Sequence, residues 1–323
     1  MLREFQVFKA LRARVPRLLD NPSVLAFAGL ILLCLAMSFV SDRFATWENL
    51  QNVMRQVSIN AIIAAGMTIV ILTGGIDLSV GAVMALSMTL TASALLAEIP
   101  IPLAIAIGLA TGAGCGAING LLIAYGRLPA IIVTLAMMEI PRGLALLKTG
   151  GYPQSGLPSE FSWIGQGNLV GLQTPIVVML VVFAVLYALL TYFPVGRYIY
   201  GIGGNEEAVR LSGVRVERTK LLAYTISGMT AAIAGIVLAS RLMSGQPNAG
   251  IGFELDAIAA VVLGGTAIVG GRGSMIGTLI GAITLGILNN GLNFMSVSPY
   301  TQKVLKGAII LLAIYAGSVK RKL

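Results

Sequence analysis

The sequence predicts an all-α, multi-pass membrane protein. Apolar residues make up 57% of the 323 positions and charged residues 11%, whereas soluble domains carry about 25% charged residues. Mean hydropathy is +0.89. A spanning helix needs about 20 mostly apolar residues, and ten stretches approach that length: 23–40, 57–74, 79–97, 101–124, 128–147, 174–193, 221–241, 254–270, 274–293 and 302–318.

The basic residues predict the orientation of these spans. Lys and Arg gather in an N-terminal segment (1–22), a loop (194–220) and a C-terminal tail (319–323), which flank and interrupt one transmembrane region (23–318). Because cytoplasmic segments are rich in Lys and Arg, both termini and the loop are expected in the cytoplasm. The first span lacks a small-residue cleavage site and is expected to be a retained anchor. Topology thus accounts for the net charge of +9, and no nucleic-acid partner is expected.

Several polar side chains interrupt the apolar stretches. Asp77 stands between two spans, where it is a polar contact at a break in the helices; the alternative is that Asp77 or Ser79 caps the next helix. Amides on or near the spans are candidates for a translocation path that would hold uncharged sugars, or they form interhelical hydrogen bonds. With Asp77 and Asp256, the candidate path residues are Asn60, Asn119, Asn289 and Asn290.

Charged residues occur in two further stretches. Glu139 and Arg142 are three residues apart in the 128–147 span, beside Pro141, and are expected to pair on one helix face. Glu254 and Asp256 open the 254–270 span, where they either favour the positive helix end or take part in gating.

Glycines recur every four residues in two spans and so share one helix face. Such ridges allow close helix packing; the alternative is that one ridge lines the path or a dimer seam. The glycines are Gly108, Gly112, Gly116 and Gly120 in the first ridge, and Gly273, Gly277 and Gly281 in the second. A weaker repeat relates TGGIDLSVG (73–81) to VGGRGSMIG (269–277), as in transporters built from internal repeats.

The most informative segment is the polar block GGNEEAVRLSGV (203–214) within the 194–220 loop. It predicts a short amphipathic helix, capped near Asn205, on the cytoplasmic face, with Glu206 and Arg210 close enough to pair. A docking role is expected, against the alternative of a solvated loop. The docking residues are Gly203, Gly204, Asn205, Glu206, Glu207, Ala208, Arg210, Leu211 and Gly213.

What the sequence lacks excludes several functions. It contains no histidine, which removes His-based metal sites and catalytic triads, and no metal site is expected. It contains no GxxxxGK[ST] phosphate-binding loop. We therefore expect no cofactor bound by this chain, no enzymatic activity of its own, and an external ATPase that uses ATP and Mg²⁺.

Four long motifs carry a family resemblance: AAGMTIVILTGGIDLSVG (64–81), GRYIYGIGGNEEAVRLSGV (196–214), SRLMSGQPNAGIGFELDAIAAVVLGGTAIVGGRGS (240–274) and GTLIGAITLGILNNGLN (277–293). They closely resemble the ribose-type permeases of bacterial ABC sugar importers, over about residues 45 to 318. The resemblance implies a homodimer in the inner membrane with the ten-helix architecture of the vitamin B12 importer. It also implies a cytoplasmic double-cassette ATPase, a periplasmic sugar-binding protein, and a coupling helix at 203–214.

The expected function is therefore ATP-driven import of a monosaccharide by alternating access, with ribose or another pentose as cargo. Phe253 stands where ribose permeases often have Tyr. Importers of galactofuranose, inositol or an autoinducer share the pattern and remain alternatives. A self-sufficient secondary transporter would need coupling-ion carboxylates in the spans, where Glu139 stands alone.

Overall fold

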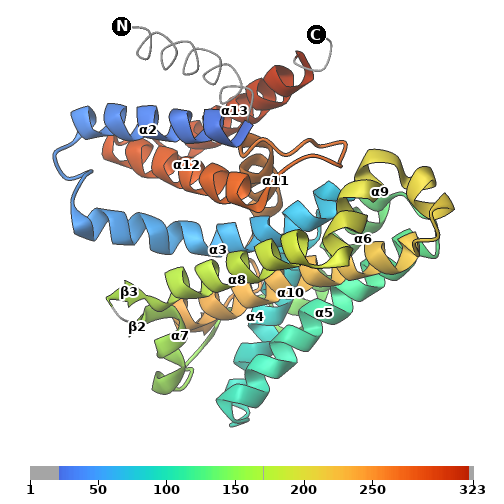
Figure 1. Ribbon diagram of the computed structural model, residues 1–323. Helices are drawn as coiled ribbons and strands as arrows, with labels where there is room; N and C mark the ends of the chain where they lie inside the picture. The colour runs from blue at the N-terminus through green and yellow to red at the C-terminus, as the bar shows by residue number, and fades with distance from the viewer. Residues whose placement is uncertain (1–21, 170, 320–323) are drawn as a thin grey trace, which may run out of the picture.

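The computed structural model describes residues 22–169 and 171–319, so most of the N-terminal segment and of the C-terminal tail lies outside the described residues. Helices dominate, and strands occur only as two-residue pairs in this part of the chain (Figure 1). The elements in chain order are α2 (Pro22–Val40), α3 (Trp47–Leu72), α4 (Val80–Leu96), α5 (Ile101–Ala124), α6 (Ala130–Thr149), β1 (Gln154–Ser155), η1 (Ser159–Ser162), α7 (Trp163–Gln166), β2 (Asn168–Leu169), β3 (Leu172–Gln173), α8 (Thr174–Tyr192), α9 (Pro194–Leu211), α10 (Val216–Leu242), β4 (Ser244–Gly245), α11 (Phe253–Leu263), α12 (Met275–Phe294) and α13 (Pro299–Val319).

Seven helices of the described chain are long and apolar enough to cross a membrane: α2, α3, α5, α6, α8, α10 and α12. The prediction of an all-α polytopic membrane protein is confirmed. α4 is apolar but has 17 residues. α3 begins ten residues before the predicted 57–74 span, because Thr46 caps it by accepting a hydrogen bond from the amide of Asn49 at 3.3 Å.

The predicted span over 254–270 is wrong as a continuous helix. α11 has 11 residues and ends at Leu263, because Gly264 and Gly265 follow and Gly265 has φ +89°, a conformation that glycine adopts at little cost. An irregular segment then leads to Ser274, whose hydroxyl caps α12 by accepting from the amide of Gly277 at 2.9 Å. The apolar run 254–270 therefore consists of a helix about half the length of a span, followed by a glycine-rich turn.

α3 lies at the centre of the molecule, and nearly every residue from Val57 to Leu72 is buried. α12 packs on one side of it, with α2 beyond, and α8 and α10 pack on the other (Figure 1). Small residues allow this close packing. A Cβ on Gly66, for example, would stand 3.0 Å from the Cα of Ser227 on α10.

The first glycine ridge faces other helices. A Cβ on Gly112 would stand 2.5 Å from the Cβ of Ala232, and one on Gly116 would stand 2.9 Å from the Cα of Thr225, both on α10. Gly108 and Gly120 likewise contact α4 and α10. Of the second set, Gly277 and Gly281 face the backbone of α11 and of Gly264, while Gly273 lies in the turn before α12 and so is not part of a helical ridge.

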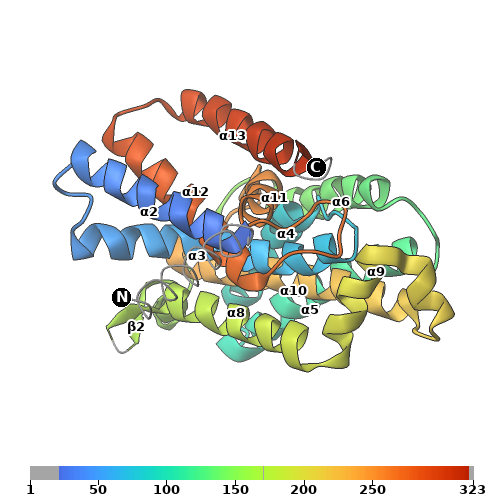
Figure 2. The ribbon, with the colours of Figure 1, turned by 45° about the horizontal axis from the view of Figure 1, so that its top comes forward.

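The two ends of the bundle differ. One end, here called the hairpin end, carries the β2–β3 hairpin, η1 and α7, and β1 pairs there with β4 (Figure 1). The opposite end, the α9 end, carries α9 and the beginning of α10, next to the turns that follow α3 and α5 (Figures 1 and 2).

Candidate functional site

The polar block forms a short helix that begins at a break in α9. Asn205 has φ −160° and ψ 98°, which interrupts the helical conformation. Its side-chain Oδ1 accepts a hydrogen bond from the amide of Ala208 at 3.0 Å, so Asn205 is the N-cap of the second part. We call this second part, Glu206–Leu211, the exposed helix. The predicted helix and its cap at Asn205 are both present.

Gly213 ends the exposed helix. Its φ of +82° lies in the left-handed region, and its amide donates to the carbonyl of Arg210 at 3.0 Å. The amide of Val214 donates to the carbonyl of Val209 at 3.4 Å. This pair of bonds is the Schellman arrangement, which favours glycine at the left-handed position. Both ends of the exposed helix are therefore fixed by local sequence.

Ion pairs hold the exposed helix to α10. Glu206 Oε1 accepts from Arg210 at 3.0 Å, the predicted pair four residues apart, and Glu206 Oε2 accepts from Lys220 of α10 at 2.6 Å. Arg210 also lies 3.6 Å from Glu207 and 3.8 Å from Glu217. These side chains are partly exposed, and surface pairs stabilise only weakly, by ~0–1 kcal/mol each. Several pairs around one arginine mainly fix the orientation of the helix.

The outer face of the exposed helix has groups for a partner. Leu211 is 80% exposed, and the Glu207 side chain is 68% exposed. An exposed leucine beside exposed charges resembles the apolar anchor and polar rim of protein interfaces. The arrangement is therefore suited to docking.

The end of the first part of α9, just before the exposed helix, meets both glycine-rich turns of the predicted repeat. Leu72 accepts a hydrogen bond from the amide of Gly271 at 3.0 Å. A Cβ on Gly270 would stand 2.7 Å from the amide nitrogen of Gly74 and 2.9 Å from the Cα of Gly203. Three backbone segments thus touch at one point: the end of α3, the turn between α11 and α12, and the end of the first part of α9. A displacement of the exposed helix would act on two helix pairs of the bundle at once.

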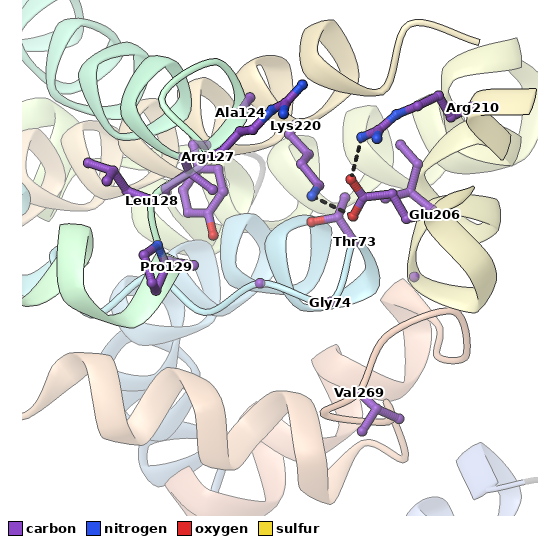
Figure 3. A pocket seen from close by; sticks show the side chains of 16 residues that line it. Thr73, Gly74, Ala124, Arg127, Leu128, Pro129, Glu206, Arg210, Lys220 and Val269 are labelled. Carbon is purple, nitrogen blue, oxygen red and sulfur yellow. Dashed lines mark hydrogen bonds and ion pairs between the residues drawn. The ribbon is translucent and has the colours of Figure 1, made fainter. Parts of the chain in front are cut away.

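A cavity of about 610 Å³ lies beside the exposed helix (Figure 3). Its wall comes from the turn after α3, the α5–α6 turn, α9 and the start of α10. Arg127, Arg210 and Lys220 line it together with a single carboxylate, Glu206. The cavity wall is therefore cationic in balance.

Asp77 and Asn119, two of the candidate path residues, belong to one buried polar cluster. Asp77 Oδ1 accepts from the Ser79 hydroxyl at 2.6 Å and from the Ser79 amide at 3.0 Å. Its Oδ2 accepts from the Ser227 hydroxyl at 2.8 Å, and Asn119 donates to Ser79 Oγ at 2.9 Å. All four side chains are at most 1% exposed. The cluster joins the α3–α4 turn to α5 and α10, and Ser79 makes no side-chain cap bond to α4.

The other path candidates lie apart from this cluster. Asp256 pairs with Lys306 of α13 at 3.0 Å. Asn290 of α12 exchanges side-chain hydrogen bonds of 3.0 and 3.1 Å with Asn49 of α3. Asn60 and Asn289 are half-buried, and the Oδ1 atom of each has no hydrogen-bond partner among the described residues.

The predicted pair between Glu139 and Arg142 is wrong. Arg142 instead donates from Nη1 to the carbonyls of Pro247 and Ala249, at 2.6 Å each. Carbonyl oxygens of the non-helical segment after β4 lie within reach of the guanidinium and need donors at membrane depth. Glu139 is exposed on α6 and has no hydrogen bond or ion pair within the ranges that the structure describes.

A family model described as a branched-chain amino acid transport system permease component matches residues 49–314. That match covers most of the chain, including nearly all of α3 and every helix from α4 to α12. The chain belongs to this permease family. It is a multi-pass membrane protein, in agreement with its helices.

Several relatives of this permease are named for sugar import or transport. It is 46% identical over 308 residues to the ribose import permease protein RbsC of Escherichia coli K12, covering 94% of this chain and 95% of the relative. It is 49% identical over 290 residues to RbsC of Bacillus subtilis, covering 89% and 90%. The L-arabinose transport system permease protein AraH of Escherichia coli K12 is 39% identical over 302 residues, covering 93% and 90%. No solved structure matches the permease.

Sequence reasoning missed parts of the site that depend on distant contacts. Lys220 completes the Glu206 pair from 14 residues further along the chain, and Ser227 reaches Asp77 from 150 residues away. Neither has a local spacing signal. The break in α9 was detectable, because Gly203, Gly204 and Asn205 all disfavour a helix interior.

Proposed function

We propose that this chain is the membrane-spanning permease subunit of an ATP-driven importer of a monosaccharide, with ribose as its cargo. The observation that carries the proposal is 46–49% identity to two ribose import permeases over at least 89% of the chain. At that identity and coverage, the similarity extends over nearly all of the membrane helices. A permease without its own phosphate-binding loop requires a separate ATPase. The capped, exposed helix offers a docking surface for it.

The exposed helix would be the contact with a cytoplasmic double-cassette ATPase, which would bind the ATP and Mg²⁺. Leu211 would insert into an apolar cleft of that partner, and the cationic cavity beside it favours an acidic partner surface, because opposite potentials align at interfaces. Movement of the ATPase would then act through Gly203 on the two glycine-rich turns. Those turns connect α3 to α4 and α11 to α12, and movement of these helix pairs would produce alternating access.

The remaining partners are a second copy of the chain, a periplasmic sugar-binding protein and the lipid of the bacterial inner membrane. The α9 end would face the cytoplasm, with both termini there, as the distribution of Lys and Arg indicates. The hairpin end, with β1–β4 and the β2–β3 hairpin, would then face the binding protein. Relatives named for L-arabinose and D-allose at 39% and 36% identity define the alternative sugars.

Uptake into right-side-out vesicles loaded with ATP tests this proposal. Vesicles would contain the chain with the proposed ATPase and sugar-binding protein, and the probes would be radiolabelled ribose, arabinose, allose and inositol. We expect ATP-dependent uptake of ribose above the other sugars. Preferential uptake of another probe would reassign the cargo, and uptake without ATP would refute the ABC mechanism.

A further inference from the structure

The segment from β4 to the residue before α11, 244–252, is non-helical and runs alongside a membrane helix. A Cβ on Gly245 would stand 2.5 Å from the Cβ of Ala92, and one on Gly250 would stand 2.7 Å from the carbonyl oxygen of Gly81. Ala92 and Gly81 both belong to α4, and at 1.5 Å per residue they are about 16 Å apart. The segment therefore follows α4 over roughly half of the ~30 Å hydrocarbon core.

Non-helical backbone at membrane depth has unpaired carbonyl and amide groups, which hydrocarbon cannot satisfy. It is tolerated where it is buried in protein or lines a water-filled cavity. Burial in protein accounts for most of this segment, and one residue of it is exposed. Ser244, Gly245 and Pro247 are buried, whereas Asn248 is exposed. The carbonyls on either side of Asn248 accept hydrogen bonds from Arg142 of α6, which holds the segment against that helix.

Glu139 lies on α6, three residues before Arg142 and thus on nearly the same helix face. It stands at the middle of the 20-residue helix Ala130–Thr149 and is exposed. A charged side chain at mid-bilayer costs at least about 2.5–3.5 kcal/mol on insertion scales, and such residues face a bundle interior or an aqueous cavity. An exposed Glu139 therefore indicates that this part of α6 does not face lipid.

Glu139, Arg142 and Asn248 form what we call the mid-span polar site. We propose that the mid-span polar site lines the aqueous path of the permease and contacts the hydroxyl groups of a neutral polyhydroxyl solute as it passes. This inference rests on the proposed function and adds the residues that meet the cargo. The carboxylate accepts hydrogen bonds from hydroxyls, the amide both donates and accepts, and the guanidinium donates. Few such groups on one face give weak binding, which lets a solute leave as well as enter.

The site differs from the path predicted from the sequence. Asp77 and Asn119 are at most 1% exposed and are hydrogen-bonded to neighbouring hydroxyls, so neither is available to a solute in this structure. Asp256 is paired with Lys306. Glu139 and Asn248, by contrast, are exposed and make no side-chain hydrogen bond within the described part of the chain.

Thiol labelling tests whether the site faces water, whatever the cargo. Cysteine would replace Glu139, Asn248 or Val185 in the full complex, in a background with Cys34 and Cys115 changed to Ala. Val185 is the control, because it is 58% exposed near the middle of α8 and lies among apolar side chains. A charged thiosulfonate reagent reacts with thiolate in water. We expect E139C and N248C to react at least about tenfold faster than V185C, since charged groups avoid hydrocarbon. Equal, slow reaction at all three positions would overturn the proposal.

Uptake of radiolabelled ribose tests the contact with solute. With membrane levels and ATP hydrolysis measured in parallel, E139L is expected to lower ribose uptake per ATP about tenfold, equivalent to ~1.4 kcal/mol. E139Q keeps a hydrogen-bonding group and is expected to retain most of the uptake. Full uptake by E139L would overturn the contact. If the wild-type complex carries no ribose, the proposed cargo fails, and the labelling result still decides whether the site lines water.

Discussion

Alanine at Gly112, compared with alanine at Gly114, measures how closely α5 and α10 pack. A Cβ at position 112 would stand 2.5 Å from the Cβ of Ala232, whereas nothing lies within 4 Å of a Cβ at position 114. Carbon atoms in contact prefer about 3.5–4.0 Å, so α5 and α10 would have to separate by roughly 1 Å. Overpacking of this kind costs about 1–3 kcal/mol.

The comparison removes the effect of helix propensity. Both positions lie inside α5, and replacing glycine by alanine within a helix gains about 1 kcal/mol at each. G114A is therefore expected to be neutral or more stable than wild type, by up to ~1 kcal/mol. G112A is expected to fall below G114A by the full overpacking cost, about 1–3 kcal/mol.

The assay is unfolding of the purified chain in mixed detergent micelles, followed by circular dichroism, with the free energy of unfolding compared between the two variants. Membrane levels before extraction provide an independent measure. Equal stability of G112A and G114A would refute the packing of α5 on α10, because the two substitutions are chemically identical and differ only in their surroundings.

Two further predictions concern the buried cluster and the energy source. D77A is expected to lower the free energy of unfolding by at least about 1–3 kcal/mol, because it leaves the buried hydroxyls of Ser79 and Ser227 without their acceptor; the same unfolding assay checks this, and stability equal to wild type would contradict it. The purified chain alone is expected neither to bind nor to hydrolyse ATP, because its sequence has no phosphate-binding loop; phosphate release that follows the chain through two chromatographic steps would contradict this.

Hydropathy and spacing predicted the elements that depend on local sequence. Long apolar runs identified the spanning helices, and the four-residue glycine spacing identified the face of α5 that meets α10. The block 203–214 predicted a capped helix because its contacts are local: Asn205 accepts from the amide of Ala208, and Glu206 pairs with Arg210 four residues on.

Sequence reasoning failed where a distant group determines the conformation or the partner. Arg142 was expected to bind Glu139, its neighbour on α6, yet it binds carbonyls more than 100 residues away. The spacing of residues along α6 contains no signal for that contact. The break after α11 had a signal, since Gly264–Gly265 and Gly270–Gly271 interrupt the apolar run, but hydropathy averaged over a window conceals single glycines.

The central claim, that a separate ATPase drives this permease through the exposed helix, is tested most directly by Leu211→Asp. Leu211 is 80% exposed, so the change should leave the fold intact. The substitution Glu206→Lys would be less informative, because it would also break the pair with Lys220. Burial of a leucine in a partner cleft is worth roughly 1.5–3 kcal/mol.

The measurement is ATP-driven ribose uptake together with co-purification of the ATPase, in the same membranes. The account predicts normal membrane levels of L211D, weakened co-purification and loss of uptake. Full co-purification with full uptake would contradict it.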